Sequence, residues 1–281
     1  VHGGEIALAN AVTAGDQPAS LPRVLARVNL FGGVGDLTGP ILIAAGRATG
    51  LSWRVLFVVA AVAVATYAVV LARTTFPPPV TERPDEDAEV PITRQARVWL
   101  LGLAALALMP LDESYLAIVL AHAERERGFS SAGAALLAIA FVAGSIAANT
   151  VLVPWVERSG AARVLGVSGA SISALMLLTA VAPGWALIPI GLAFSGLIGM
   201  TWLAVTATAL VANPGREGRT KLVVELMEFA SLGVVLLLGI VADRAGLSTA
   251  LLAYAVVPLG LVVAAFGLRV SVRPGLSTRP P

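Results

Sequence analysis

The stretch VNLFGGVGDLTGPILIAAG, Val28–Gly46, is apolar except for one ionisable side chain, that of Asp36. An apolar helix of about 18 or more residues can cross the hydrocarbon core of a bilayer, which is about 30 Å thick. A carboxylate at the centre of such a helix costs about 2.5–3.5 kcal/mol on insertion scales. The stretch therefore predicts a transmembrane helix in which Asp36 faces a polar interior rather than lipid.

The whole chain has the composition of a membrane protein. Of its 281 residues, 57% are hydrophobic and 13% are charged, and the mean hydropathy is +0.87. Soluble proteins carry about 25% charged residues, so this chain could not cover a soluble surface. The absence of cysteine excludes disulfides and thiolate chemistry, and two histidines without an H-E-x-x-H pattern indicate no metal site. We predict an all-α, polytopic helical membrane protein without metal or cofactor.

Eight apolar windows bounded by charges, proline and glycine predict transmembrane helices. They are Val28–Gly46, Val55–Ala72, Val98–Ala121, Ala132–Val153, Val164–Ala182, Trp185–Ala212, Leu222–Ala242 and Leu247–Phe266. The segment Arg73–Arg97 between the second and third windows is rich in proline and charge, so it predicts a linker. The chain then divides into an N-terminal part with two helices (1–72), the linker (73–97) and a six-helix C-terminal half (98–281).

The distribution of basic residues predicts the orientation, because Lys and Arg favour the cytoplasmic side. If the linker is cytoplasmic and the sides alternate, fourteen basic residues lie inside: Arg23, Arg27, Arg73, Arg83, Arg94, Arg97, Arg158, Arg163, Arg216, Arg219, Lys221, Arg269, Arg273 and Arg279. Five lie outside: Arg47, Arg54, Arg125, Arg127 and Arg244. We expect a multi-pass protein of the cell membrane, plasma or inner, with both ends of this chain in the cytoplasm. The scattered arginines form no patch for nucleic acid.

Four short patterns of this sequence resemble motifs of one family of transporters. GDLTGP resembles the G-x-x-x-G-P core of the fifth-helix motif of its antiporters, with Gly35, Gly39 and Pro40 at the motif positions, although Ala26, Ile43 and Ala44 replace further motif glycines. LSWRVLF, Leu51–Phe57, resembles the start of the sixth helix. VPWVERSGAAR resembles the family's charged cytoplasmic loop, with Glu157, Arg158 and Gly160 at its D, R and G positions. GIVADRAG, Gly239–Gly246, resembles the end of the eleventh helix. The family that these four patterns resemble is the major facilitator superfamily.

The resemblance implies a non-enzymatic protein that moves a small solute by alternating access, with proton-coupled efflux or antiport indicated by the fifth-helix motif. On this numbering, the chain corresponds to helices five to twelve. About four helices would then precede Val1, on a longer chain or on another one. In the family, helices six, nine and twelve face lipid, and the corresponding windows here contain no charged residue. A bundle that turns its charges away from lipid requires this pattern.

The intramembrane acids are the candidate coupling residues. Asp36 lies about 12 Å from either end of its window at 1.5 Å per residue, so it is a candidate proton carrier or a carboxyl hydrogen-bonded to a neighbouring helix. Asp112 and Glu113 follow Pro110, where a broken helix could present polar backbone to a solute. Because adjacent helical residues point about 100° apart, one of the two acids faces the cavity, with Tyr115 on the side of Asp112; otherwise the pair lies in the outer mouth.

Further candidates lie towards the helix ends. Glu225 is expected to pair with Lys221 four residues earlier, whereas Glu228 lies deeper and is a transport candidate. Trp202, at mid-window, either lines a cavity or packs. Glu157 and Arg158, with Gly160, are candidates for a cytoplasmic gate. The segment from His122 to Arg127 predicts a solvated outer loop.

Two other classes of protein remain as alternatives. GVGD, Gly33–Asp36, matches the G-x-G-D of intramembrane aspartyl proteases, but the second aspartate that must share a proton has no counterpart on a preceding helix. A truncated, non-transporting membrane protein is the other alternative, because alternating access needs two halves. The sequence favours transport and leaves the solute, the coupling ion and the direction open.

Overall fold

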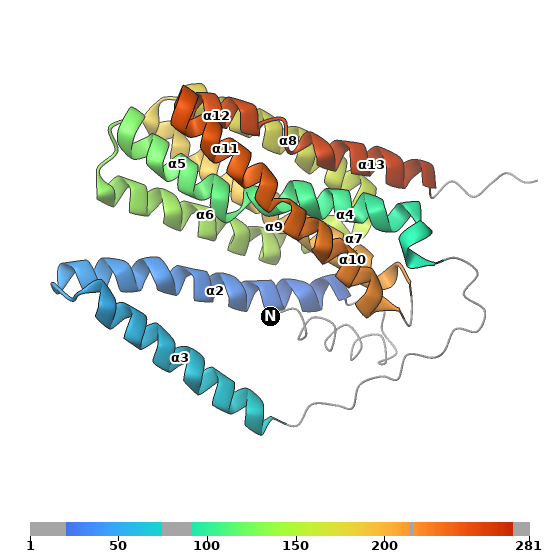
Figure 1. Ribbon diagram of the computed structural model, residues 1–281, viewed down its shortest axis with the longest axis horizontal. Helices are drawn as coiled ribbons and strands as arrows, with labels where there is room; N and C mark the ends of the chain where they lie inside the picture. Colours follow the sequence, from blue (N-terminus) through green and yellow to red (C-terminus); the bar gives the residue numbers. More distant parts are fainter. Residues whose placement is uncertain (1–20, 75–90, 214–215, 272–281) are drawn as a thin grey trace, which may run out of the picture.

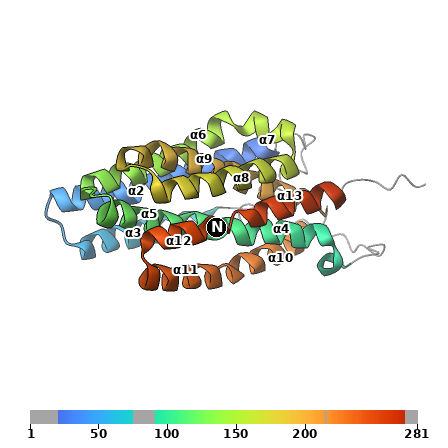
Figure 2. The same ribbon diagram turned by 90° about the horizontal axis from the view of Figure 1, so that it is seen from above.

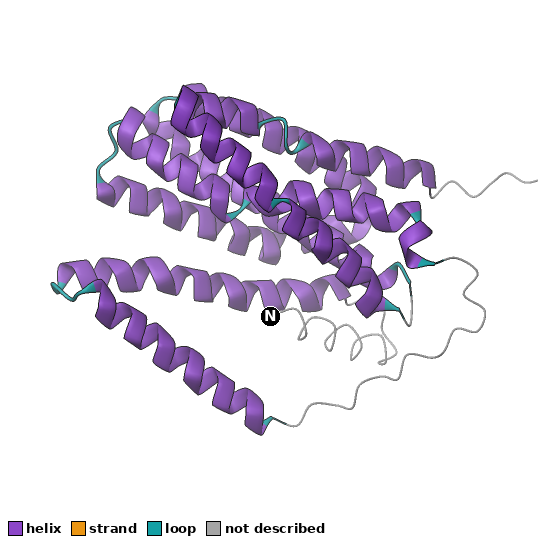
Figure 3. Ribbon diagram, viewed as in Figure 1, coloured by secondary structure: helices purple, strands orange, loops and turns teal. Residues whose placement is uncertain are grey.

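The computed structural model describes residues 21–74, 91–213 and 216–271 (Figure 1). Regular structure in these residues is helical throughout, and no strand occurs among them (Figure 3). The longer helices are α2 (Leu21–Ala48), α3 (Trp53–Arg73), α4 (Ala96–Leu108), α5 (Glu113–Glu126), α6 (Ser131–Val151), α7 (Val153–Ser159), α8 (Ala161–Val181), α9 (Leu187–Val211), α10 (Glu217–Ala230), α11 (Leu232–Ala245), α12 (Leu247–Tyr254) and α13 (Leu259–Ser271). Single 3₁₀ turns occur at Ile92–Arg94, Met109–Leu111 and Gly184–Ala186.

Six helical stretches within the described residues are long and apolar enough to cross a membrane. They are Ala96–Glu126, Ser131–Val151, Ala161–Val181, Gly184–Val211, Gly218–Ala245 and Leu247–Ser271. They coincide with the six windows predicted after the linker. The two earlier windows also form helices, α2 and α3, and α3 contains a shorter apolar stretch, Arg54–Val70. The division into an N-terminal part, a linker and a C-terminal half stays a prediction, and most of the predicted linker lies outside the described residues.

Three of the six stretches are broken, and only the break at Pro110 had a signal in the sequence. Between α4 and α5 the chain tightens into a 3₁₀ turn at Pro110, which has no N–H to continue the helix. The Tyr254 hydroxyl donates a hydrogen bond to the Pro110 carbonyl. The other breaks lie at Ser231, between α10 and α11, and before Leu259, where Pro258 precedes α13.

The centre of the bundle is a cluster of four aromatic rings from four helices. Tyr115 of α5 stacks on Phe194 of α9, with ring centroids 4.1 Å apart. Phe141 of α6 and Tyr254 of α12 tilt against Tyr115 at 6.1 and 5.8 Å. Such pairs contribute about 0.5–1.5 kcal/mol beyond the area that they bury. The cluster joins helices that lie far apart in the sequence.

Small residues let the helices approach closely. A Cβ atom on Gly144 of α6 would lie 2.1 Å from the carbonyl oxygen of Leu192 on α9. On Gly169 of α8 it would lie 2.8 Å from the Pro258 carbonyl oxygen. Without a hydrophobic driving force between helices in lipid, association depends on close backbone packing of this kind. The glycines therefore fix the spacing of α6 against α9 and of α8 against α13.

Helices α2 and α3 lie at one side of the bundle. In Figures 1 and 2, α2 runs along α6. Helix α3 diverges from the bundle, and its contacts to α2 are few (Figure 1). Most of its large apolar side chains are exposed, and those of Phe57 and Val64 are more than two-thirds exposed. A helix that is apolar all round suits lipid or a further helix as its surroundings.

The two ends of the bundle differ in charge. We call the end where α3 stops and α4 starts the linker end, and the opposite one the far end (Figure 1). Helices α8 and α10 start at the linker end, and α13 stops there. The described basic residues of the linker end are Arg23, Arg27, Arg73, Arg94, Arg97, Arg158, Arg163, Arg216, Arg219, Lys221 and Arg269. Those of the far end include Arg54, Arg125, Arg127 and Arg244, so the linker end is the more basic of the two.

The contact between α6 and α9 gives a test of this packing. Gly144→Ala places a methyl group on the Leu192 carbonyl, and such overpacking costs about 1–3 kcal/mol. We expect thermal unfolding in detergent, followed by circular dichroism, to shift to lower temperature by several degrees. Gly239→Ala in α11 is the control, since no atom lies within 4 Å of its added Cβ. An equal or smaller loss in the Gly144→Ala variant would contradict the close approach.

Candidate functional site

The contact between α2 and α6 joins the helix that contains the predicted fifth-helix motif to the C-terminal bundle. Asn29 Nδ2 lies 3.5 Å from Asn149 Oδ1, and a Cβ on Gly33 would lie 2.9 Å from Ile146. Both contacts fit an antiparallel arrangement of the two helices, because residue numbers rise along α2 while they fall along α6. Asn149 is buried and also donates to the Ser145 carbonyl at 3.0 Å. The interface is therefore polar at Asn29 and tightly packed one turn later.

An ion pair closes this interface at the linker end. The Arg23 guanidinium, in the first turns of α2, lies against the Glu157 carboxylate of α7, with Nε–Oε1 at 3.1 Å and a second hydrogen bond at 3.2 Å. The Arg23 side chain is 67% exposed and that of Glu157 is 20% exposed. Arg158 is exposed beside it, and Gly160 takes a φ of +72° in the turn that leads into α8. Two solvent-accessible charges of this kind contribute about 0.2–1 kcal/mol.

Asp36 lies on the face of α2 that meets α6. It follows Asn29 by seven residues, which is nearly two turns, so the two side chains leave the helix in similar directions. Asp36 itself is exposed, so the interface is open at its level. The motif glycines Gly35 and Gly39 face open space, whereas Gly33 meets a neighbour. The Pro40 side chain lies outside what the structure describes.

The break between α4 and α5 places the second group of acids. Asp112 is exposed, with a ψ of −101°, and its carbonyl accepts a hydrogen bond from the Leu116 N–H at 3.1 Å. The side chain of Glu113 is not among those described. Tyr115 is 1% exposed, and its hydroxyl donates to Thr179 Oγ1 at 2.8 Å. The helix starts after Asp112, so the 100° rule behind the predicted common side of Asp112 and Tyr115 does not apply across the break, and that prediction stays untested.

A buried cation lies between α9 and α10 near the linker end. Lys221, the only lysine of the chain, is 2% exposed, and its ammonium lies 5.8 Å from the centre of the Trp202 ring. Its Nζ lies 3.8 Å from Glu225 Oε1, which confirms the expected pair. Trp202 thus packs against this cation, and Glu228 follows Glu225 on the same face, half-buried. A cation over an indole face is stabilised by about 0.5–2 kcal/mol, more when desolvated.

A polar network ties three helices together at the far end, where a solvated loop was expected. The fully buried His122 accepts from Arg127 Nε at Nε2 (3.1 Å) and donates from Nδ1 to Glu126 Oε2 (3.0 Å). Arg127 also donates to the Ala180 carbonyl of α8 at 2.6 Å, and Ser248 of α12 donates to Glu126. Since Arg127 can only donate, the neutral imidazole carries its proton on Nδ1.

Some of these placements had a signal in the sequence. A lone lysine beside an apolar run, four residues before Glu225, indicated an ion pair but not its burial under Trp202. His122 and Glu126 stand four apart, which is the spacing of a helical pair rather than of a loop. Nothing in the sequence indicated the role of Asn149 in the α2–α6 contact, because its partner Asn29 lies on another helix. No group of three or more His, Asp and Glu side chains placed to bind a metal occurs among the described residues.

Comparisons with known proteins identify the fold. No model of a known protein family matches the sequence, and no curated protein does. Among solved structures, the chain is similar to the crystal structure of the E. coli fucose:proton symporter FucP, with a TM-score of 0.68. The alignment has 17% sequence identity and covers 92% of this chain and 71% of that one. The protein thus has a helical membrane fold like that of this symporter, which agrees with the fold that the resemblance to the major facilitator superfamily had implied.

The network of His122 gives a stability test. Arg127→Gln removes the donors to the His122 ring and to the buried Ala180 carbonyl, and an unsatisfied buried acceptor costs about 1–3 kcal/mol. We expect a lower unfolding temperature in detergent. Arg125→Gln, at an exposed position two residues earlier, is the matched control and should leave the unfolding temperature unchanged. Equal unfolding temperatures for the two variants would show that the network contributes nothing.

Proposed function

We propose that the protein is a secondary active transporter, which moves a small solute across a membrane by alternating access with protons as the coupling ion. The observation that carries the proposal is an acid, Asp36, on the face of α2 that meets α6 in a transporter fold. The similar solved structure is that of a sugar:proton symporter, which supports the same class of activity here. The partial fifth-helix antiporter motif favours efflux by antiport.

In this proposal, Asp36 carries the proton. An ionised carboxylate at this depth needs water or a polar partner, whereas the neutral acid can lie against an apolar helix. Protonation of Asp36 would therefore favour closure of the open level of the α2–α6 interface, and release of the proton would favour its opening. The helix break at Asp112 and Glu113, and the acid Glu228, provide further candidate positions for the proton or for a cationic solute.

The linker-end contacts act as the cytoplasmic gate in this proposal. Arg23 and Glu157 join α2 to α7 only while the two parts of the chain are close at that end. Arg158 lies beside Glu157 in the last turn of α7, and Gly160 ends that helix and so helps to fix the position of Glu157. Because the ion pair is partly solvated and weak, it can break and reform at each transport cycle. A strong buried pair in this place would hold the gate shut.

A flux assay with Asp36→Asn tests the coupling. The protein is reconstituted in vesicles containing a pH-sensitive dye, and neutral and cationic solutes including L-fucose are added. We expect solute-dependent proton movement with the native protein and a loss of at least tenfold in the Asp36→Asn variant, with solute exchange between equal pools retained. Asp243→Asn, which changes an exposed carboxylate on α11 at the far end, is the control. Native proton movement in the Asp36→Asn variant, or none with any solute in the native protein, would contradict the proposal.

A labelling assay tests the gate. Ala26 is buried on the α6-facing side of α2, and the chain has no cysteine, so Ala26→Cys gives a single reporter. Glu157→Arg removes the ion pair, worth about 0.2–1 kcal/mol, so maleimide labelling should be up to about fivefold faster. The additional change Arg23→Glu restores opposite charges and should return the rate to its starting value. An unchanged rate in the single variant, or no recovery in the exchanged pair, would contradict a gate at this contact.

A further inference from the structure

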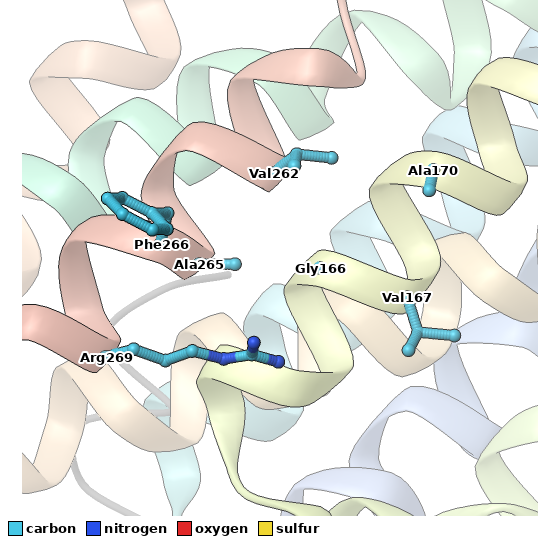
Figure 4. A pocket seen from close by; sticks show the side chains of 7 residues that line it. All are labelled: Gly166, Val167, Ala170, Val262, Ala265, Phe266 and Arg269. Carbon is cyan, nitrogen blue, oxygen red and sulfur yellow. The ribbon is translucent and has the colours of Figure 1, made fainter.

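An apolar groove runs between α8 and α13 on the outer surface of the bundle. Its lining residues are Gly166, Val167 and Ala170 on α8, and Val262, Ala265, Phe266 and Arg269 on α13 (Figure 4). The groove has a volume of about 370 Å³, and nearly all of its lining is apolar. Its floor is closed, because a Cβ on Gly166 would touch the Ala265 Cβ at 3.4 Å. It is therefore a groove along the surface of two packed helices rather than a gap between separated ones.

Two arginines stand at the linker end of this groove. Gly169 lies against Leu261 and Val262, and Gly166 against Ala265, so α8 and α13 run antiparallel in one register. Continuing that register by one turn brings Arg163 level with Leu268 and Arg269. Arg163 also shares a face of α8 with Gly166 and Ala170, at helical spacings of three and seven. Figure 4 shows the Arg269 side chain extending from α13 towards α8, across the end of the groove.

Neither arginine has a partner within the described part of the chain. Both are exposed, and no side-chain hydrogen bond or ion pair joins Arg163 or Arg269 to another described residue. Arg23, in contrast, is matched by Glu157 at the same end. Two unmatched guanidinium groups at a bilayer surface present donors with the geometry that phosphate accepts. The apolar groove that leads away from them is suited in shape and polarity to an acyl chain.

We propose that this groove binds an anionic phospholipid, with one acyl chain along Val167, Ala170 and Val262 and the phosphate on Arg163 and Arg269. The apolar chain and the charged head of such a lipid are joined in the same order as the groove and its arginines. A second helix would fill the apolar groove but would need an acid at this end to match the arginines, whereas an anionic phospholipid carries its phosphate next to its acyl chains. Basic residues between helices at the membrane surface attract anionic headgroups. This site is separate from the α2–α6 interface and does not depend on what is transported.

Fluorescence quenching by brominated lipids tests the site. The chain has no cysteine, so Val167→Cys accepts one environment-sensitive dye in the groove. The labelled protein is placed in vesicles of phosphatidylcholine that contain equal fractions of either brominated phosphatidylglycerol or brominated phosphatidylcholine. We expect brominated phosphatidylglycerol to quench the dye at least about twice as strongly as brominated phosphatidylcholine does. The double variant Arg163→Gln/Arg269→Gln should be quenched equally by both lipids.

Two controls separate this site from general attraction of anionic lipid. A dye at Leu236→Cys, on the exposed face of α11, reports bulk lipid and should show no preference. Arg244→Gln, which changes an exposed arginine at the far end, should leave the preference at Val167→Cys intact. Equal quenching by both lipids in the native background, a preference that survives in the double variant, or a dye protected from both lipids by another helix would each overturn the proposal. Gel filtration and circular dichroism verify that all variants are folded.

Discussion

The close approach of α6 to α9 is the contact on which the remaining arrangement depends. Lipid offers no hydrophobic gain for bringing two apolar helices together, so their backbones have to meet closely enough for dispersion and polar contacts to hold them. Gly144 allows this approach, and α6 is then free on its other side to receive α2. The same helix thus belongs to the core of the C-terminal bundle and to the interface that carries Asp36. A change in its spacing would alter both.

Several polar side chains of the bundle lie in contacts between its helices. Tyr115 with Thr179, His122 with Arg127, and Lys221 with Trp202 and Glu225 are built into contacts between helices. A buried polar group without a partner is costly in a medium of low polarity, so these side chains are committed to holding the bundle together. Asp36 differs from them in that it is exposed, although it lies on the face of α2 that meets α6. This difference in placement, rather than residue type, singles it out for the proposed proton transfer.

The two ends of the bundle use arginine in different ways. At the linker end, Arg23 pairs with Glu157 across the α2–α7 contact, and Arg163 and Arg269 lie beside the apolar groove without such a partner among the described residues. At the far end, Arg127 is held by His122 and the Ala180 carbonyl. The proposed gate and the proposed lipid site thus lie on the same end but on different faces. An effect of lipid on transport would act through helix packing rather than through a shared residue.

Composition, apolar windows and helical spacing by themselves determined that this is an all-α membrane protein, placed the ends of its helices to within about two turns, and predicted the Lys221–Glu225 pair. Each of these predictions depends on residues close together in the chain, whose relative positions are set by helix geometry. The break at Ser231, the burial of Tyr115 and His122, and the open surroundings of Gly35 and Gly39 were decided only by tertiary structure. These features depend on which other helix arrives at a given face, and the spacing of residues along one helix contains no information about that neighbour.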